Sequence, residues 1–331
     1  MNKRLKAARM GSFVLILALF GTVLAFTDLE KAAQAFAGIK WRWAIWVPVL
    51  NVANTFVEGL RLAIILLPVT GRFEVRNCFN SALVAIMGNI MLPLRFGDGA
   101  RTYYIAKTEK ISLSSSFSAL MLDRIADFLL FFALMAITAI LHPFPPSVTR
   151  IGLTAGFIFA LSVGMIFALT GIGSHIGQGS VGKLRRRIAR EVGNFMSGLS
   201  VMRNGGLLFP IILCSAVSWL LRSSMLWSMF KAFSFDLPLT AAPIVLILLN
   251  FGIAIVSTPA NLGGFELGVV AALNRLFSVK MVMALSYAVA LHAIEVGPMI
   301  AFAMVFLWHE GFRTSDVLKS AKEEMEKQQT P

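Results

Sequence analysis

Charged and imidazole side chains occur in closely spaced pairs inside otherwise apolar stretches of this sequence. Arg124 and Asp127 stand three residues apart in one stretch, and His292 and Glu295 have the same spacing in another. Side chains three residues apart share one face of a helix. Charged groups are costly inside a membrane and usually serve a function there. These pairs are therefore candidates for binding the polar part of a substrate.

A third pair, Glu58 and Arg61, has the same spacing, and a further carboxylate, Asp123, directly precedes Arg124. An ion pair within one helix can also serve stability alone. For Glu58 and Arg61, the sequence leaves a structural role and a binding role equally open.

Two apolar runs are interrupted by a proline that is followed, four residues later, by a glycine. Unwound backbone at membrane depth must be buried in protein or line a wet cavity. A half-helix that begins after such a break directs its N–H groups and its positive dipole end at that cavity, which suits an anion such as phosphate. The breaks are Pro93 with Gly97, accompanied by Arg95, Asp98 and Arg101, and Pro259 with Gly263, followed by Glu266.

Together these side chains predict a polar cavity of mixed charge. Arginine holds a lipid phosphate through two parallel hydrogen bonds. Carboxylates and imidazole can bind a cationic headgroup or exchange protons. The predicted substrate-binding residues are Arg95, Asp98, Arg101, Arg124, Asp127, Glu266, His292 and Glu295.

The sequence predicts no metal, cofactor or catalytic site. Its four histidines are scattered without the spacing of metal ligands, and its two cysteines lie in or beside apolar runs. Gly177–Leu184 approaches the phosphate-binding loop of nucleotide hydrolases, but Leu184 replaces the hydroxyl residue that binds magnesium. A transporter is therefore expected rather than an enzyme.

The elements that must position these residues are long apolar helices. Hydrophobic types make up 57% of the 331 residues and charged types 14%, against roughly 25% charged in soluble domains. The apolar runs approach or exceed the roughly 20 residues of a spanning helix and are too continuous for barrel strands. We predict an all-α polytopic membrane protein with about six spanning helices and two Pro/Gly-broken re-entrant hairpins. The clearest runs are Met10–Phe26, Trp43–Pro68, Phe117–Leu141, Ile151–Gly171, Leu207–Phe230, Leu239–Val256 and Ala284–Trp308.

The formal net charge of +13 arises largely from loops between the apolar runs, which is typical of the positive-inside rule and not of nucleic-acid binding. Residues 181–203 combine basic side chains with apolar ones at helical spacing. This pattern predicts a basic amphipathic helix on the inner leaflet, attracted to anionic lipid, with a solvated linker as the alternative. Its predicted membrane-surface residues are Lys183, Arg185, Arg186, Arg187 and Arg190.

The basic segment also sets the predicted topology, because basic loops face the cytoplasm. Counting spans from it places both chain ends in the cytoplasm, with the start interpreted as an uncleaved first span. The short run Cys78–Leu92 then begins and ends on one side, which predicts the first re-entrant hairpin. Leu239–Val256 and Leu267–Phe277 form the second, which either re-enters or spans.

Two halves, about 10–141 and 151–308, share an order of two spans, a broken hairpin and a third span. In the predicted topology they have opposite orientations, a pattern typical of transporters built from inverted repeats. We predict one integral membrane domain over 1–309, whose halves the basic linker joins, and a short polar cytoplasmic tail at 310–331.

The same residues resemble the lysylphosphatidylglycerol synthase transmembrane-region family. Pro93–Arg101, Ser114–Ser118 and Leu122–Asp127 resemble its first signature, and Thr258–Glu266 resembles its second. The resemblance covers about Met10 to Trp308. It implies a lipid flippase domain, a kind that occurs both alone and fused to an aminoacyl-phospholipid synthase. No aminoacyl transfer is implied here, because the segment after Trp308 is too short for a synthase domain.

The chain departs from the family pattern in three places. Gly97-Asp98 stands where the family usually has Gly-Glu, which keeps the carboxylate. Pro259-Ala260-Asn261 stands where it usually has Pro-Gly-Gly, and His292 stands where an arginine is often found.

The residues and the resemblance together predict a standalone flippase-like protein of the cytoplasmic membrane that moves a phospholipid or a lipid-linked headgroup between leaflets. Its expected partners are membrane lipids, anionic or lipid-linked, and not nucleic acid. A second copy of the chain and a lipid-modifying enzyme remain open as further partners. The alternative functions are a membrane-embedded transferase acting on a lipid carrier and an accessory subunit that does not itself transport.

Overall fold

A computed structural model describes residues 38–91, 97–141, 144, 146–176, 183–256 and 258–309 of the chain. Across these ranges the regular structure is helical and no strand forms. Among the described residues, five helical segments are long and apolar enough to cross a membrane: Trp41–Thr70, Leu113–Leu141, Val148–Met165, Gly205–Ala232 and Met281–Ala303. The protein is therefore an all-α polytopic membrane protein. The predicted first span, Met10–Phe26, and the predicted tail, 310–331, lie outside the described residues.

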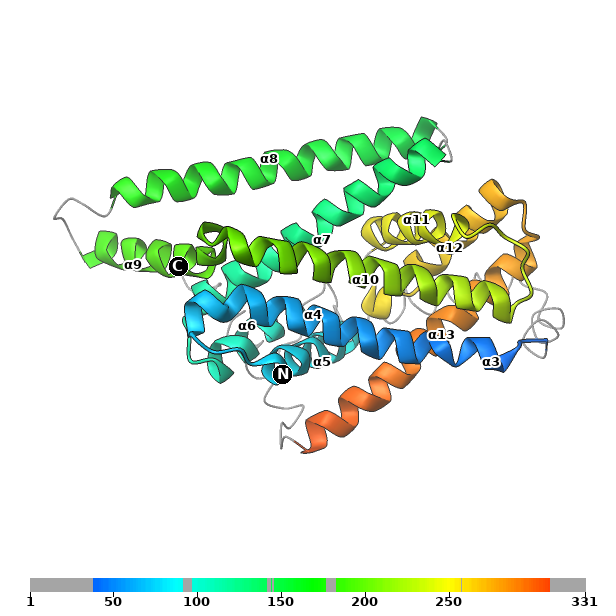
Figure 1. The fold of residues 1–331 in the computed structure, drawn as a ribbon, viewed down its shortest axis with the longest axis horizontal. Helices are drawn as coiled ribbons and strands as arrows, with labels where there is room; N and C mark the ends of the chain where they lie inside the picture. Colours follow the sequence, from blue (N-terminus) through cyan, green and yellow to red (C-terminus); the bar gives the residue numbers. More distant parts are fainter. Residues whose placement is uncertain are drawn as a thin grey trace, which may run out of the picture. The chain divides into compact units, whose positions relative to one another are not determined.

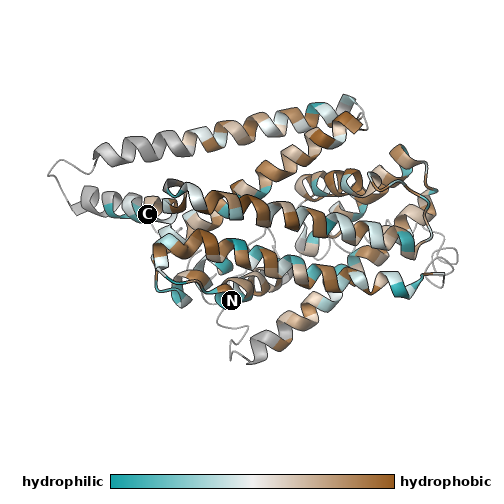
Figure 2. Ribbon diagram, in the orientation of Figure 1, coloured by the Kyte–Doolittle hydropathy of each residue, from teal (hydrophilic) through white to brown (hydrophobic). Residues whose placement is uncertain are grey.

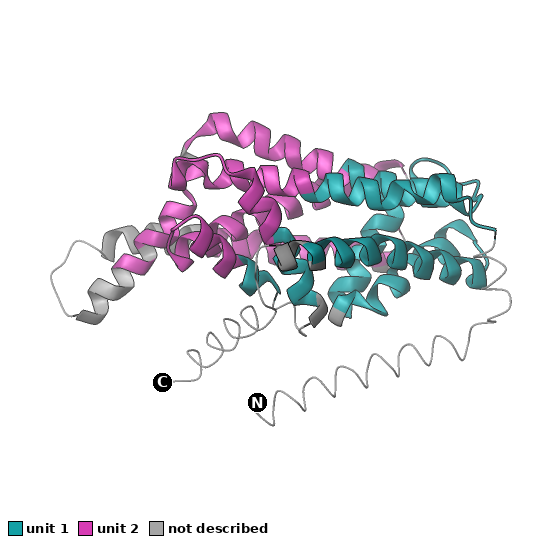
Figure 3. Ribbon diagram, turned by 90° about the horizontal axis from the view of Figure 1, so that it is seen from below, with its two compact units in different colours: residues 1–55, 82–101, 220–331 teal, residues 56–81, 102–219 magenta. Residues whose placement is uncertain are grey.

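The chain divides into two compact units (Figure 3). Unit 1 comprises Met1–Thr55, Ala82–Arg101 and Leu220–Pro331, and unit 2 comprises Phe56–Ser81 and Thr102–Trp219. Each unit takes segments from both of the halves distinguished in the sequence. The inverted repeat of those halves stays a prediction.

Unit 1 is built around a hairpin of two helices, α11 (Ala241–Ile255) and α12 (Gly264–Phe277), which pack along each other (Figure 1). α12 also packs against α13 (Met281–His309). The unit further contains α3 (Trp41–Ala44) and parts of α4 (Trp46–Thr70), α5 (Val75–Met91), α6 (Gly97–Thr108) and α10 (Gly205–Ala232).

Glycines bring the backbones of α11 and α12 into direct contact. A Cβ atom on Gly252 would lie 2.3 Å from the carbonyl oxygen of Gly264, and one on Gly268 would lie 2.5 Å from that of Leu248. Gly264 and Gly268 are four residues apart, the spacing at which small residues let membrane helices approach closely. The hairpin therefore has no room for a side chain along this seam.

Unit 2 is built around α7 (Leu113–Leu141), which packs against both α8 (Pro146–Ile176) and α9 (Lys183–Gly198). Serines of α7 bind the C-terminal half of α9: the Ser115 hydroxyl donates to the carbonyl of Asn194 over 2.8 Å, and Ser114 donates to the Glu191 carboxylate. The short 3₁₀ helix Ser200–Arg203 follows α9 and leads into α10.

Hydrophobic residues, drawn in brown, predominate along the spanning helices (Figure 2). Ile140, Phe157 and Phe209 are exposed on α7, α8 and α10 respectively. Large exposed apolar areas of this extent are unusual on water-soluble proteins. Because hydrocarbon tails are as apolar as these side chains, the exposed faces suit contact with lipid.

Candidate functional site

The break between α11 and α12 holds three residues with left-handed backbone. α11 ends at Ile255, the chain turns through Pro259–Asn261, and α12 begins at Gly264. The φ angles are 54° at Ala260, 59° at Asn261 and 84° at Gly263. For a residue with a Cβ atom, this conformation costs roughly 1–2 kcal/mol. Ala260 and Asn261 both have a Cβ atom, so this chain adopts a turn suited to glycine without having glycine at either position.

Glu266 caps the first turn of α12 after this break. Its Oε2 atom accepts the Gly263 N–H over 2.7 Å, which satisfies one of the backbone donors that a helix start leaves open. The negative charge also suits the positive end of the helix dipole. The Thr258 hydroxyl donates to the carbonyl of Leu262 and closes the loop on itself.

His292 reaches this break from α13. Its Nδ1 atom lies 2.6 Å from Oε1 of Glu266, and its Nε2 atom lies 3.0 Å from the carbonyl oxygen of Ala260. The Phe265 ring stacks on the imidazole with a centroid distance of 4.3 Å and an interplanar angle of 18°. His292 is buried. The structure thus brings together two of the predicted site residues, Glu266 and His292, at the second break.

Glu295 lies one turn beyond His292 on α13 and is half-buried. Its backbone carbonyl accepts a hydrogen bond of 3.0 Å from the Asn51 side chain. The groups that interact electrostatically with its carboxylate include His292 and Arg222 of α10. The carboxylates of Glu266 and Glu295 therefore both lie in the electrostatic field of His292.

At the first break, Pro93 and Arg95 lie outside the described residues. Gly97 begins α6, and its N–H donates to Oδ1 of Asn89 over 2.9 Å. Asp98 is half-buried in the first turn of α6, and Arg101, 2% exposed, is buried one turn further on. A Cβ atom on Gly88 would lie 2.5 Å from Cα of Gly97, so α5 and α6 also meet at backbone distance.

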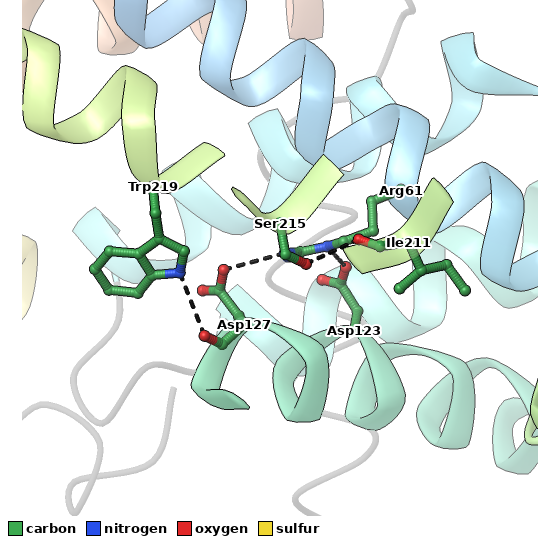
Figure 4. A network of polar contacts seen from close by, with 6 residues as sticks. All are labelled: Arg61, Asp123, Asp127, Ile211, Ser215 and Trp219. Carbon is green, nitrogen blue, oxygen red and sulfur yellow. Dashed lines mark hydrogen bonds and ion pairs between the residues drawn. The ribbon is translucent and has the colours of Figure 1, made fainter. Parts of the chain in front are cut away.

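A second polar cluster lies within unit 2 and centres on Arg61 (Figure 4). Its Nε atom lies 2.6 Å from Oδ1 of Asp123, and its Nη1 atom lies 3.1 Å from Oδ1 of Asp127. Nη1 also donates to the Ser215 hydroxyl over 2.8 Å. The Trp219 indole N–H donates to the backbone carbonyl of Asp127 over 3.3 Å. Side chains from α4, α7 and α10 thus meet around one buried guanidinium.

The partners in this cluster extend beyond those that spacing suggests. Arg61 binds two carboxylates of α7, Asp123 and Asp127, which stand four residues apart and so share a helix face. Arg124 lies on the exposed side of α7. Ser215 and Trp219 were not among the predicted site residues. Their own four-residue spacing on α10 is the signal that identifies them as one helix face.

The predicted membrane-surface residues belong to α9, whose bounds fall within the predicted linker. Arg190 is exposed. The side chains of Lys183, Arg185, Arg186 and Arg187 lie outside what the structure describes. No group of three or more His, Cys, Asp or Glu side chains suited to a metal ion occurs among the described residues.

Comparison with known proteins adds one match. A family model described as the lysylphosphatidylglycerol synthase TM region matches residues 9–303, a range that includes both breaks and the Arg61 cluster. No curated protein and no solved structure matches the chain significantly.

Proposed function

This chain belongs to the lysylphosphatidylglycerol synthase transmembrane-region family, and from that premise we propose that it moves a phospholipid or a lipid-linked headgroup across the cytoplasmic membrane. The family is a membrane domain with a lipid-related role. The observation that carries the proposal is the break in the α11–α12 hairpin, where a carboxylate and an imidazole meet unwound backbone inside apolar helices. Polar groups in such surroundings typically mark a transport path.

The proposed substrate-binding residues divide by charge. Arg95, Arg101 and Arg124 are suited to a phosphate, because guanidinium offers paired donors to its oxygens. The acidic residues, Asp98, Asp127, Glu266 and Glu295, together with His292, are suited to the cationic or hydroxyl part of a headgroup. In the same proposal, both chain ends face the cytoplasm and α9 lies on the inner leaflet.

Leaflet exchange of fluorescent phospholipids in liposomes tests this function. The purified protein is expected to speed exchange, and Arg101→Gln is expected to lower the rate about tenfold or more, since one lost charged hydrogen bond costs about 1.5–3 kcal/mol. Arg101→Lys keeps the charge but loses the paired donors, so an intermediate rate is expected. Arg150, exposed on α8, supplies the matched control as Arg150→Gln, which should exchange lipid like the wild type.

Two results would count against the proposal. Exchange at the unassisted rate with anionic, cationic and polyprenyl-linked lipids alike would overturn it and leave the transferase and accessory-subunit alternatives. Full activity of a folded Arg101→Gln variant would instead remove Arg101 from the binding residues.

A further inference from the structure

We propose that His292 and Glu266 form a proton-binding site, in which one shared proton fastens the broken segment between α11 and α12 to α13. The site is defined by two contacts of the imidazole and one of the carboxylate. This inference does not rest on lipid transport. The protonation of His292 and the opening of the broken segment can both be measured in a protein that moves no lipid.

The hydrogen-bond partners fix how many hydrogens the pair can hold. The Ala260 carbonyl only accepts, so the imidazole Nε2 atom, 3.0 Å away, must carry a hydrogen. On the carboxylate, Oε2 already accepts the Gly263 N–H. The remaining contact, 2.6 Å between Nδ1 and Oε1, needs one hydrogen between its two atoms. That hydrogen resides either on the nitrogen, as imidazolium and carboxylate, or on the oxygen, as imidazole and carboxylic acid.

Removing the shared proton breaks one of the two imidazole contacts. A neutral imidazole has a single N–H, so either a lone pair on Nδ1 faces the Glu266 carboxylate or a lone pair on Nε2 faces the Ala260 carbonyl. Adding a second proton breaks neither contact, because a protonated carboxyl keeps a carbonyl oxygen that accepts the Nδ1–H. The pair therefore loses its hold on the segment as the pH rises.

The segment that His292 contacts has a strained backbone at Ala260. The acceptor of its Nε2 atom is the carbonyl of Ala260, a residue with a φ of 54° and a Cβ atom. The left-handed backbone disfavours this residue by roughly 1–2 kcal/mol, and the bond to His292 opposes that tendency. When the shared proton is lost, one of the two imidazole contacts is lost with it, and His292 no longer joins Glu266 to Ala260.

Among the described residues, the titratable groups that act on His292 belong to unit 1. Glu266 of α12 and Glu295 of α13 act on it directly, and Arg222 of α10 acts on Glu295. Tyr287, also on α13, donates its hydroxyl to the carbonyl of Leu226. α11 contains no titratable side chain. At the first break the corresponding amide, Gly97 N–H, is accepted by Asn89, whose side chain does not titrate.

Nitrogen NMR of protein labelled with ¹⁵N-histidine tests the shared proton directly, with the His292 signals assigned by their loss in His292→Gln. In the wild type we expect a protonated Nε2 and a Nδ1 with a shared hydrogen around neutral pH, and loss of that hydrogen as the pH rises. In Glu266→Gln, the Gln carbonyl can accept the Gly263 N–H while its amide donates to Nδ1. The hydrogen bonds are kept, and Nδ1 should be unprotonated from neutral to alkaline pH.

Thiol labelling of Leu262→Cys measures how often the segment between α11 and α12 opens. The native Cys78 and Cys214 are replaced by serine for this experiment. The labelling rate at each pH is divided by that of a free cysteine peptide, because the reactive thiolate itself becomes more abundant as the pH rises. Because one proton is released, the open population should then rise by up to about tenfold per pH unit on the alkaline side. Glu266→Gln should lose this rise. The matched control, Glu109→Gln, changes the same side chain in a contact with Asn77 in unit 2 and should keep it.

The proposal is overturned if Nδ1 of the wild type carries no shared hydrogen at any pH, or if Glu266→Gln labels with the same pH profile as the wild type. If Glu266→Gln does not fold, the wild-type NMR titration alone still decides. A confirmed proton site together with absent lipid exchange would contradict the transport function and leave this site intact.

Discussion

At the scale of single residues, Arg61 is a buried side chain of unit 2 that holds several polar partners together. It is 1% exposed and contacts Asp123, Asp127 and Ser215. Replacing it by methionine keeps most of the volume but leaves two carboxylates without this partner. Breaking a buried ion pair in this way costs roughly 3–5 kcal/mol. We expect Arg61→Met to lower the free energy of unfolding in detergent by that amount, measured by denaturant titration.

The control for this measurement is Arg150→Met, the same replacement on the exposed side of α8, which should change the free energy of unfolding by less than about 0.5 kcal/mol. An equal loss in both variants would mean that the Arg61 cluster adds nothing specific to stability.

Ala260 tests the strain at the second break. Its φ of 54° suits glycine. We expect Ala260→Gly to leave stability unchanged or to raise it by up to about 1 kcal/mol, because relief of strain offsets the greater freedom of the unfolded chain. A β-branched residue is more strongly disfavoured there, so Ala260→Val should lower stability by about 1–3 kcal/mol. Equal stability of both variants, measured by the same unfolding titration, would show that Ala260 does not adopt this conformation.

Residue pairs were only partly predictable from the sequence. Glu266 and His292 both belong to the predicted site, but nothing in their spacing, 26 residues apart, indicates that they touch. Likewise, spacing suggested Glu58 as a neighbour of Arg61, and the structure adds Asp123 and Asp127 of another helix. Periodicity reveals which residues share a helix face, whereas contacts between helices depend on how those faces pack.

At the scale of elements, apolar runs predicted the helices well and their ends less well. The run Phe117–Leu141 lies within α7, which begins four residues earlier at Leu113. The additional residues are Leu113 and three serines, of which Ser115 and Ser116 donate to the backbone carbonyls of Asn194 and Thr102. Hydropathy therefore finds the middle of a spanning helix and misses a polar end that continues the same helix. The break at Pro259–Asn261 was predictable because proline and glycine mark it.

The α11–α12 seam gives a prediction at this scale. A Cβ atom on Gly268 would lie 2.5 Å from the Leu248 carbonyl oxygen and 2.6 Å from Cα of Leu249. Gly268→Ala must push the two helices apart, and overpacking of this kind costs about 1–3 kcal/mol. Gly164→Ala on α8 provides the control, because a Cβ atom there meets nothing within 4 Å. Unfolding titrations of both variants should show a loss only for Gly268→Ala, and no loss there would mean that α11 and α12 lie further apart.

At the scale of the whole molecule, the proposed orientation predicts which loops face which side. Arg72, between α4 and α5, should be cytoplasmic, and Asp236, between α10 and α11, should be external; both are exposed. With Cys78 and Cys214 replaced by serine, Asp236→Cys should react with an impermeant thiol reagent added outside intact cells. Arg72→Cys should react only after the membrane is opened. The reverse result would invert the topology.

The division into two compact units is a property that the sequence did not indicate. Counting spans and charges gives two consecutive halves, because both signals are local. The units instead combine separated segments, and α4 and α10 each contribute residues to both. Such a division depends on which helices contact each other, and runs of hydrophobic residues do not predict contacts between helices.

The glycine seam between α11 and α12 has a consequence for how this part of unit 1 can move. Two helices that touch through side chains can slide as those side chains change rotamer, but helices in contact through their backbones have no such freedom. Any sliding of α11 along α12 would first have to lift one from the other. α11 and α12 must therefore move together as one rigid unit, and bending is limited to the loops at the two ends of this unit.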